Sequence, residues 1–472
     1  MSESVPSKSD KHLFHLLFMA LVAALGGFLF GFDTGVVSGL MSSITARYEL
    51  TPLGEGWFAS SVLIGCILGA SVAGIAADAF GRKIVLLSSA VLFVVSACGC
   101  GYPPSFTGLV LFRFIGGIGV GVASMVAPLY ISEISPPRSR GRLVSIFQLA
   151  IVFGIFASYA SNALIHSVPP RLPGLFTQEQ LAFIFIEQNW RGMFLMGCLP
   201  ALAFLGLTFF IPESPRWWAA HGRTDRARQT LAAILGEEEA RREIQEIENV
   251  LQQKTGTIAE LFGSRMRFGL MVGVLLMFFS QVTGINVIMY FGNQVFEEAG
   301  FSKGFAFVLQ TVVGLTNIAF TFLAIWKIDQ WGRKPLLKIG TVVIFCVLSL
   351  MTALFFLKTQ GYSNTPLLVM LPFLEVIFIG AFAMSWGPVP WVVVSEIFPA
   401  RIRGRAASVG TVSIWISCFL VVQTFPIIKS FAPEFCFVLY ATCMIPAMLF
   451  VWLAMPETKG RSLEELEKEL YG

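Results

Sequence analysis

The sequence predicts an all-α membrane protein whose twelve transmembrane helices form two six-helix bundles with pseudo-twofold symmetry, plus short cytoplasmic helices. Three observations support this prediction. Of the 472 residues, 55% are hydrophobic and 13% are charged, with a mean hydropathy of +0.74, which is too apolar for a soluble chain of this length. Apolar runs recur along the whole chain, and motifs of the first half return in the same order in the second half.

Each apolar run is long enough for a helix that crosses the hydrocarbon core of a bilayer, which takes about 20 residues. The first run passes through Asp33 without a small-residue cleavage site, so it predicts a retained helix and not a signal peptide. The runs cover residues 14–38, 55–79, 84–102, 108–131, 143–164 and 192–211 in the first half, and 268–295, 305–327, 336–357, 366–394, 406–428 and 435–455 in the second.

Three motifs are repeated between the halves. The Asp-x-x-Gly-Arg-Lys turn at 78–83 returns at 329–334, and Ser-Glu-Ile at 132–134 returns at 395–397, each time before a basic segment. The Pro-Glu pair at 212–213 returns at 456–457. A repeat of this size suggests two similar bundles around one central pathway.

The loops after runs two, four, six, eight and ten are basic, and the other loops carry few charges. By the positive-inside rule, these loops and both termini are cytoplasmic. Composition then divides the chain into an N-terminal bundle (1–215), a cytoplasmic helical linker (216–265), a C-terminal bundle (266–457) and a cytoplasmic C-terminal helix (458–472). Apolar residues recur at helical spacing among the charges of the linker, which is either a passive connection or a latch under the bundles.

The sequence lacks the motifs that would indicate metal binding, phosphate binding, nucleic-acid binding or catalysis. The eight cysteines lie in or beside apolar runs, and the four histidines are scattered, so we predict no metal and no cofactor. The glycines at 116–121 lie inside an apolar run with no strand before them, which favours helix packing over phosphate binding. The net charge of +4 follows from the basic loops and does not indicate nucleic-acid binding. No nucleophile paired with a base is present, so an enzyme is the weakest reading.

The repeated motifs supply candidates for a cytoplasmic gate. An arginine that leaves the membrane at such a turn can reach helix C-terminal carbonyls or a carboxylate on a neighbouring helix. Taken singly, each residue is an ordinary topology anchor; their repetition in both halves favours gating. The candidates are Asp78, Arg82, Asp329 and Arg333, with the predicted pairs Glu133–Arg140, Glu213–Arg216 and Glu396–Arg403.

Five motifs in order resemble those of the sugar porter family of the major facilitator superfamily, closest in pattern to bacterial xylose/proton and glucose/proton symporters. They are Gly-Arg-Lys at 81–83, Arg-Phe-Ile-Gly-Gly-Ile-Gly-Val-Gly at 113–121, Pro-Glu-Ser-Pro-Arg-Trp at 212–217, Gln-Val-Thr-Gly-Ile-Asn at 281–286 and Pro-Glu-Thr-Lys-Gly at 456–460. The resemblance implies a sugar site between the bundles, alternating access, and a place in a bacterial inner membrane.

Asp33 lies inside the first run, where an ionised carboxylate must be paired or neutralised. Its best predicted partner is Arg113, at the start of the fourth run. Protonation of Asp33 would release Arg113, and renewed pairing would expel the proton, giving a two-state element. The resemblance agrees, because similar bacterial xylose/proton symporters have Asp here and the glucose facilitators of animals have Asn. A purely structural salt bridge is the alternative.

A desolvated sugar needs fixed hydrogen-bond partners and an aromatic face. The resemblance places such residues in mid-membrane on several runs, although helix packing explains any one of them equally well. The candidates are Phe30, Gln148, Gln281, Asn286, Tyr290, Asn317, Trp391 and Trp415. Ser280 and Ile414 depart from the common pattern, where an amide is frequent, so the sequence does not identify the sugar.

The sequence therefore predicts a proton-coupled monosaccharide symporter for a pentose or hexose, acting as a monomer with sugar, protons and membrane lipid as its partners. Two alternatives stay open. A uniporter would keep Asp33 ionised and structural, and a sugar sensor would bind sugar without carrying it. A sensor would be expected to carry a long signalling tail, whereas this sequence ends soon after its last amphipathic stretch.

Overall fold

The computed structural model describes residues 8–136, 139–167, 182–251, 258–264, 266–362, 365–399 and 402–461. Within them lie twelve helical segments long and apolar enough to cross a membrane, as the sequence predicted. These are α1 (Lys8–Tyr48), α2 (Pro52–Phe80), α3 (Arg82–Gly101), α4 (Phe106–Ile134), α5 (Arg140–Ser167), α7 with α8 (Asn189–Met196, Cys198–Thr208), α13 with α14 (Arg267–Val282, Ile285–Glu298), α15 (Lys303–Trp331), α16 (Arg333–Thr359), α17 with α18 (Thr365–Met384, Val389–Ile397), α19 (Arg403–Phe431) and α20 (Pro433–Leu453).

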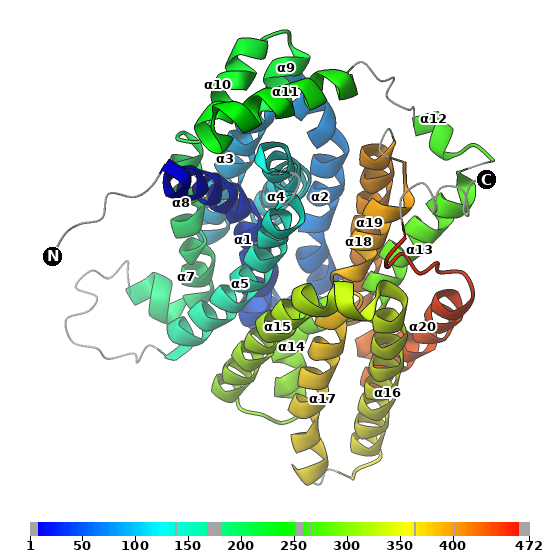
Figure 1. The fold of residues 1–472 in the computed structure, drawn as a ribbon. Coiled ribbons are helices and arrows are strands. Elements are labelled where there is room, and N and C mark those ends of the chain that lie inside the picture. The colour runs from blue at the N-terminus through cyan, green and yellow to red at the C-terminus, as the bar shows by residue number, and fades with distance from the viewer. Residues whose placement is uncertain are drawn as a thin grey trace, which may run out of the picture.

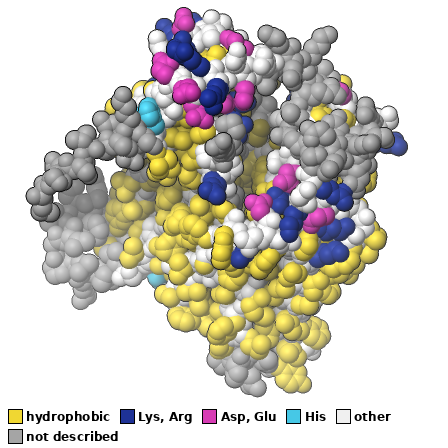
Figure 2. Space-filling model, in the orientation of Figure 1, with side chains coloured by type: hydrophobic (Ala, Val, Ile, Leu, Met, Phe, Trp, Pro, Cys, Tyr) yellow, Lys and Arg dark blue, Asp and Glu magenta, His cyan; other side chains and the backbone are white. Residues whose placement is uncertain are grey.

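The spans form two groups that follow the halves of the chain (Figure 1). Helices α1–α5, α7 and α8 make the N-terminal bundle, and α13–α20 make the C-terminal bundle. Hydrophobic side chains cover much of the visible surface of the bundles, while charged side chains gather over the short helices above them (Figure 2). This distribution suits walls that face lipid, which has no water to solvate a charge.

Glycines allow the helices of the N-terminal bundle to approach closely. A Cβ at Gly117 or Gly121 of α4 would meet the backbone of Val62 or Cys66 in α2, and one at Gly31 of α1 would meet the backbone of Ile151 in α5. The glycine run at 116–121 therefore packs helices, as predicted from the sequence, because only a residue without a Cβ fits between these backbones.

Two spans of the C-terminal bundle are broken in mid-course. Gly284 separates α13 from α14 with a φ of +86°, a left-handed conformation that glycine adopts without strain. Gly387 and Pro388 separate α17 from α18. Breaks of this kind free backbone carbonyls and are tolerated at membrane depth where protein or a water-filled cavity surrounds them.

Between the bundles the chain forms α9 (Pro215–Ala220), α10 (Thr224–Leu235), α11 (Glu237–Leu251) and α12 (Ile258–Leu261). Helices α9–α11 share a small apolar core that includes Leu231 and Ile247, so the amphipathic pattern of this segment does reflect helices. A hydrogen bond of 3.0 Å joins His12 Nδ1 and the carbonyl oxygen of Ala233, holding α10 against α1. Most of the predicted C-terminal helix, from residue 462 on, lies outside the described residues.

Candidate functional site

The two bundles touch mainly at one end. We call the end that carries α9–α12 the linker face and the other end the opposite face. Between described residues, the hydrogen bonds that join the bundles lie toward the opposite face. They are Asn293 N to Ser38 Oγ (3.2 Å), Ser42 Oγ to Glu297 Oε2 (3.3 Å), Lys303 Nζ to Ser43 Oγ (3.4 Å), Ser60 Oγ to Gln423 Oε1 (2.7 Å), Gln423 Nε2 to the Leu53 carbonyl (3.3 Å), and Tyr159 Oη to the Met289 carbonyl (3.2 Å).

A ring contact reinforces this closure. His166 of α5 stacks on Phe307 of α15 with ring centroids 4.7 Å apart, near the opposite-face ends of both helices. Phe153 meets Phe322 of the same two helices edge-on at 6.2 Å, nearer the middle of the spans. The bundles are thus closed over each other at the opposite face. A bound molecule at mid-membrane would therefore exchange with water by way of the linker face.

Asp33 and Arg113 meet inside the N-terminal bundle. The distance from Arg113 Nη1 to Asp33 Oδ1 is 3.5 Å. Arg113 is fully buried, its Nε donates to the Phe58 carbonyl at 3.2 Å, and its guanidinium lies over the Phe58 ring. Neither Nη1 nor Nη2 has a well-formed hydrogen bond among the described residues. A buried guanidinium with two unfilled donors is held by one carboxylate at a loose distance, so the pair can separate at little cost in hydrogen bonds.

The predicted amides of the broken seventh span form a local chain. Asn286 Nδ2 donates to Gln281 Oε1 at 2.6 Å, and Gln281 Nε2 donates to Ser280 Oγ at 2.9 Å. Position 280, where an amide is frequent in the common pattern, therefore still carries a polar group here, because the Ser280 hydroxyl accepts the hydrogen bond that positions Gln281. Gln281 and Asn286 are only partly buried, so each has hydrogen-bonding capacity to spare.

The aromatic candidates divide into two sets. Phe30 of α1 and Trp415 of α19 face each other across the bundles with ring centroids 5.3 Å apart, and the buried indole N–H of Trp415 lacks a partner among the described residues. Tyr290 is buried on α14. Trp391 is 42% exposed on α18, and no ring contact brings it to the others.

The remaining candidates lie on neighbouring helices. Asn317 is buried on α15 and accepts a 3.5 Å hydrogen bond from Thr321, while Gln148 is half-buried on α5. Ile414 is buried beside Trp415 on α19. The amide candidates thus come from both bundles, with Gln148 on α5 and Gln281, Asn286 and Asn317 on α13, α14 and α15.

Sequence reasoning missed three buried polar side chains. Trp386, at the break before α18, donates from Nε1 to Thr341 Oγ1 at 3.0 Å. Tyr159 bridges the bundles, and Glu375 of α17 is 1% exposed with both carboxyl oxygens unpartnered among the described residues. Only Glu375 had a signal in the sequence, since an acid inside an apolar run is expensive unless it has a role.

The gate candidates form two matching networks, but with partners that differ from the prediction. Glu133 pairs with Arg82 through two hydrogen bonds of 3.0 Å and not with Arg140. Ser214 Oγ also donates to Glu133. In the second half, Glu396 accepts a hydrogen bond of 2.7 Å from Arg333 and a second hydrogen bond from Thr458 Oγ1. The Arg403 side chain lies outside the described residues.

The turn geometry explains these partners. Gly81 and Gly332 adopt φ values of +94° and +89°, which turn Arg82 and Arg333 back under their bundles. Each arginine also reaches the aspartate four residues before it, Asp78 at 3.1 Å and Asp329 at 2.9 Å. The Asp–Arg turns therefore act within a bundle, because their carboxylate partners come from the same bundle.

Glu213 does not pair with Arg216, in contrast to the prediction. Its carboxylate accepts backbone N–H groups of Arg82, Lys83 and Ser214 at 2.8 to 3.2 Å. Burial raises the pKa of Glu213, and these N–H donors act in the other direction. Glu457 accepts the backbone N–H groups of Arg333 and Lys334 in the same way, so both Pro-Glu motifs fasten a turn.

Arg140 instead contacts the linker. Its Nη2 lies 3.5 Å from Glu243 Oε1 of α11. Burial raises the pKa of Glu243, and Arg140 opposes that shift. With the donation from Trp217 Nε1 to the Asp78 carbonyl (2.9 Å), this contact holds α9–α11 against the N-terminal bundle.

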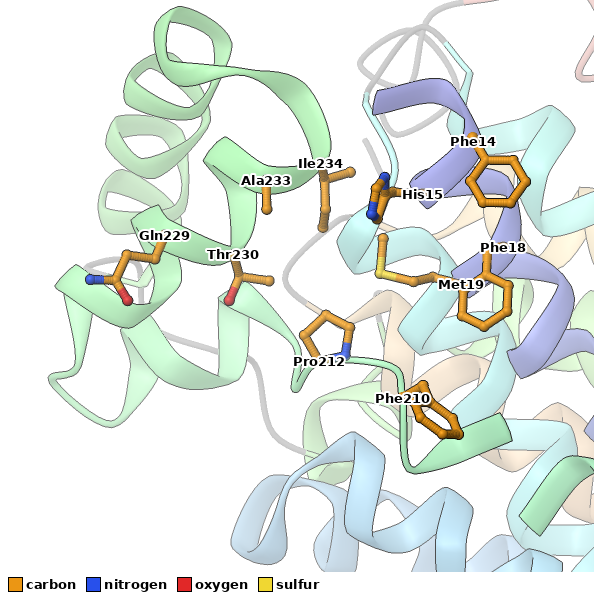
Figure 3. A pocket seen from close by; sticks show the side chains of 10 residues that line it. All are labelled: Phe14, His15, Phe18, Met19, Phe210, Pro212, Gln229, Thr230, Ala233 and Ile234. Atoms are coloured by element: carbon orange, nitrogen blue, oxygen red, sulfur yellow. The ribbon is translucent and has the colours of Figure 1, made fainter. Parts of the chain in front are cut away.

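A cavity of about 650 Å³ lies at the linker face (Figure 3). Phe14, His15, Phe18 and Met19 of α1 line one side, and residues of α10, including Thr230 and Ile234, line the other (Figure 3). The lining of this cavity is mostly apolar. The cavity lies outside the two bundles and does not include Phe30 or Trp415, so it gives no support to a sugar site between the bundles.

Comparisons with known proteins agree with this architecture. The chain matches the family model for the Sugar (and other) transporter over residues 19–470. It is 36% identical to the arabinose-proton symporter of Bacillus subtilis (strain 168), covering 99% of this chain and 98% of that protein, and 38% identical to the D-xylose-proton symporter of Escherichia coli (strain K12), covering 96% and 95%.

Among solved structures, the inward open conformation of the xylose transporter XylE from E. coli superposes with a TM-score of 0.81 at 34% identity. The match covers 96% of this chain and 100% of that one. The sequence match, the twelve spans and the inter-bundle geometry together place this chain in the Sugar (and other) transporter family.

Proposed function

We propose that this protein is a proton-coupled monosaccharide symporter that works by alternating access and imports a pentose or hexose. The observation that carries the proposal is the loose Asp33–Arg113 pair, with a buried arginine whose outer N–H groups lack other partners. The names of the two relatives make L- or D-arabinose and D-xylose the first sugars to test. We propose that the linker face is cytoplasmic, since the basic loops lie there.

Asp33 would hold the transported proton. With the carboxyl protonated, its attraction to Arg113 falls to that of a neutral hydrogen bond, and Arg113 is free to turn toward other acceptors. With the proton released toward the linker face, the carboxylate pairs with Arg113 again. Coupling requires that the bundles reorient readily only when Asp33 is protonated and sugar is bound, or when both are absent.

Membrane voltage supplies enough free energy for accumulation. Moving one charge across 100 mV is worth about 2.3 kcal/mol, which corresponds to roughly a fifty-fold gradient of sugar at about 1.36 kcal/mol per decade. A voltage contribution therefore suffices even without a pH difference.

We propose that sugar binds between the bundles, at the level of Phe30 and Trp415. The two rings offer an apolar surface for the C–H face of a sugar, and the Trp415 indole N–H is free to donate. Gln281 and Asn286 would take hydroxyls, with Gln148, Tyr290 and Asn317 completing the site. Trp391 would join only by moving with α18, whose break at Gly387 permits it. One chain contains both bundles, so we propose that a monomer suffices.

Asp33→Asn tests the coupling. The amide keeps the size of the protonated carboxyl but does not ionise, so it cannot release and take up a proton during the cycle, and we expect counterflow of labelled sugar to persist. Accumulation driven by an imposed pH step should disappear. The measurement is uptake into proteoliposomes over a panel of arabinose, xylose, glucose and inositol.

Three results would contradict the proposal. If accumulation survives in Asp33→Asn, the protein carries its proton elsewhere or is coupled in another way. If the unaltered protein equilibrates sugar without moving protons, it is a uniporter, and if it binds sugar without counterflow, it is a sensor.

A further inference from the structure

Glu375 is a second carboxyl buried deep in the bilayer region. It lies well inside α17, between the buried residues Leu371, Leu374 and Phe378. Its side chain is 1% exposed, and neither carboxyl oxygen has a hydrogen-bond partner among the described residues. Asp33 has Arg113, but no cation of the described part of the chain forms an ion pair with Glu375. An ionised carboxylate in such a place is strongly disfavoured, so the closed structure accommodates the neutral acid.

The charges on the surrounding helices are too far away to change this conclusion. Helix α17 packs against α14, α15 and α16. Their charged side chains lie within about two turns of the helix ends and do not act on Glu375, and neither do the neutral groups Tyr290 and Cys346. The charged residues are Glu297, Glu298, Lys303, Lys327, Asp329, Arg333, Lys334, Lys338 and Lys358.

A titratable group of the other bundle lies at the same depth as Glu375. Tyr159 of α5 is 1% exposed and packs on Gly314 of α15, where a Cβ would meet its ring at 2.9 Å. Helix α17 packs on the same helix, with Gly380 against the Phe320 ring, so Glu375, about one turn before Gly380, lies at the level of Gly314. The same Tyr159 hydroxyl donates to the Met289 carbonyl and contacts Met289 Sδ, both at 3.2 Å. Glu375 therefore lies at the depth of one of the contacts that close the bundles at the opposite face.

A buried amide adds to this polar group. Gln310 of α15 is 1% exposed and donates from Nε2 to the Ile288 carbonyl at 3.0 Å, one residue before Met289. Its Oε1 accepts no hydrogen bond among the described residues. The junction between α14, α15 and Tyr159 thus contains a buried amide acceptor without a donor among the described residues. Acceptors of this kind are poorly placed beside an anion and better placed beside a neutral acid, which can donate.

We propose that Glu375 is a proton-binding group of the opposite-face gate, and that the bundles close there only over its protonated form. Separation at the opposite face removes Tyr159 from Met289 and lets water approach the junction. The Glu375 carboxyl then gives its proton to water as hydronium, and before closure a carboxylate oxygen takes one back from water on the same side. The step makes closure depend on pH at the opposite face without adding to the proton carried by Asp33.

This inference rests on the alternating access proposed above, but not on proton-coupled transport. Because closure takes up a proton, the closed-to-open ratio should fall by up to about tenfold for each unit that the pH rises, over the range in which the open form is ionised. A neutral residue at position 375 should remove this dependence and leave the gate closed.

The gate can be followed by a spin-label distance between Leu53→Cys and Phe431→Cys, at the opposite-face ends of α2 and α19, with the exposed Cys98 and Cys346 replaced by serine. The distance is measured in two proteins, one that keeps Glu375 and one with Glu375→Gln. Both carry Asp33→Asn, which excludes titration of Asp33. From pH about 5 to about 9, we expect the short distance to give way to a longer one with Glu375 and to persist in Glu375→Gln.

Glu434→Gln provides a matched control, since Glu434 lies at the opposite-face end of α20 and should leave the pH response intact. Glu375→Met, which is neutral and similar in volume, should behave like Glu375→Gln and serves if the amide variant misfolds. Infrared spectra of the closed form should also contain a protonated-carboxyl C=O band that Glu375→Gln lacks.

The inference is overturned if the distance in the Glu375 protein does not respond to pH, if both neutral variants respond as strongly as their parent, or if no carboxyl band is lost. A failure of the transport proposal is a separate result, because it concerns proton flux in the unaltered protein and not the pH response of the gate.

Discussion

At the scale of single residues, the interior is defined by polar groups with unused hydrogen-bonding capacity. Arg113, Trp415 and Glu375 are each almost fully buried and each leave donors or acceptors unfilled among the described residues. A buried unsatisfied group costs stability. Arg113 and Glu375 lie inside one bundle each, and Trp415 lies at the contact between the bundles. In the proposed cycle a substrate or a proton would satisfy such groups.

One prediction concerns the amide chain of the proposed sugar site. Asn286→Ala removes the donor to Gln281 Oε1 and one sugar partner. A lost hydrogen bond of about 0.5–1.5 kcal/mol should raise the half-saturating sugar concentration roughly two- to twelve-fold. Counterflow measured over a range of sugar concentrations gives this value.

Thr316→Ala is the control, because Thr316 is half-buried on α15 and its hydroxyl bonds the Val312 carbonyl of its own helix. It should leave sugar affinity unchanged. Equal affinities for Asn286→Ala and the unaltered protein would place Asn286 outside the sugar site.

At the scale of elements, the repeated turns show how similar motifs give unequal networks. In the N-terminal bundle, Arg82 binds Glu133 through two hydrogen bonds, and the Glu133 side chain is 4% exposed. In the C-terminal bundle, Arg333 reaches Glu396, whose side chain is 27% exposed. The two turns are alike in sequence, but water screens the second more strongly.

This difference predicts unequal losses of stability. Arg82→Ala leaves Glu133 buried without a cation and should cost about 3–5 kcal/mol. Arg333→Ala leaves a carboxylate that water reaches, so its cost should be clearly smaller. Thermal unfolding of the purified variants in one detergent compares them directly.

A second substitution that neutralises Glu133 tests whether the unpaired buried charge causes the loss of stability. Glu133→Gln in the Arg82→Ala background should recover part of the loss, since the uncompensated charge is then gone. Similar melting temperatures for Arg82→Ala and Arg333→Ala would contradict the argument from burial.

At the scale of the whole molecule, the contacts between the bundles determine which face is closed. Helix α2 meets α19 so closely that a Cβ on Gly56 would collide with the backbone carbonyl of Gln423. Ser60 and Leu53 bond the same glutamine. A single glycine therefore permits closure at the opposite face, and the broken spans allow the bundles to move apart at the linker face.

Gly56→Leu should prevent this closure. The added side chain has no space beside Gln423, so the bundles should stay open at the opposite face. We expect sugar binding, measured by calorimetry in detergent, to remain within a few-fold, and counterflow in proteoliposomes to be lost.

Gly74→Leu on the same helix is the matched control, because a Cβ there meets nothing within 4 Å. It should keep counterflow. Counterflow that persists in Gly56→Leu would show that this approach of α2 to α19 is not required for the cycle.

Sequence patterns predicted the fold well because each level of it is encoded locally. Twelve apolar runs give twelve spans, since the bilayer leaves a hydrophobic segment of that length few alternatives to a helix. The Asp33–Arg113 pair was predicted for the related reason that a charge inside an apolar run needs a partner. Pairing within the basic turns was predicted less well, because Glu133 had several arginines within reach along the chain.

The amino-acid sequence by itself determined the spans, the duplication, the family and the lone acid of the first helix, all of which depend on local composition or on repeated motifs. Only the tertiary structure decided that Arg82 and not Arg140 takes Glu133, that the bundles close at the opposite face, and that Tyr159 of α5 bonds the Met289 carbonyl of α14. These are contacts between residues 50 to more than 200 positions apart. Their geometry depends on how helices cross and where a glycine lets them touch, and no periodicity along the chain records that.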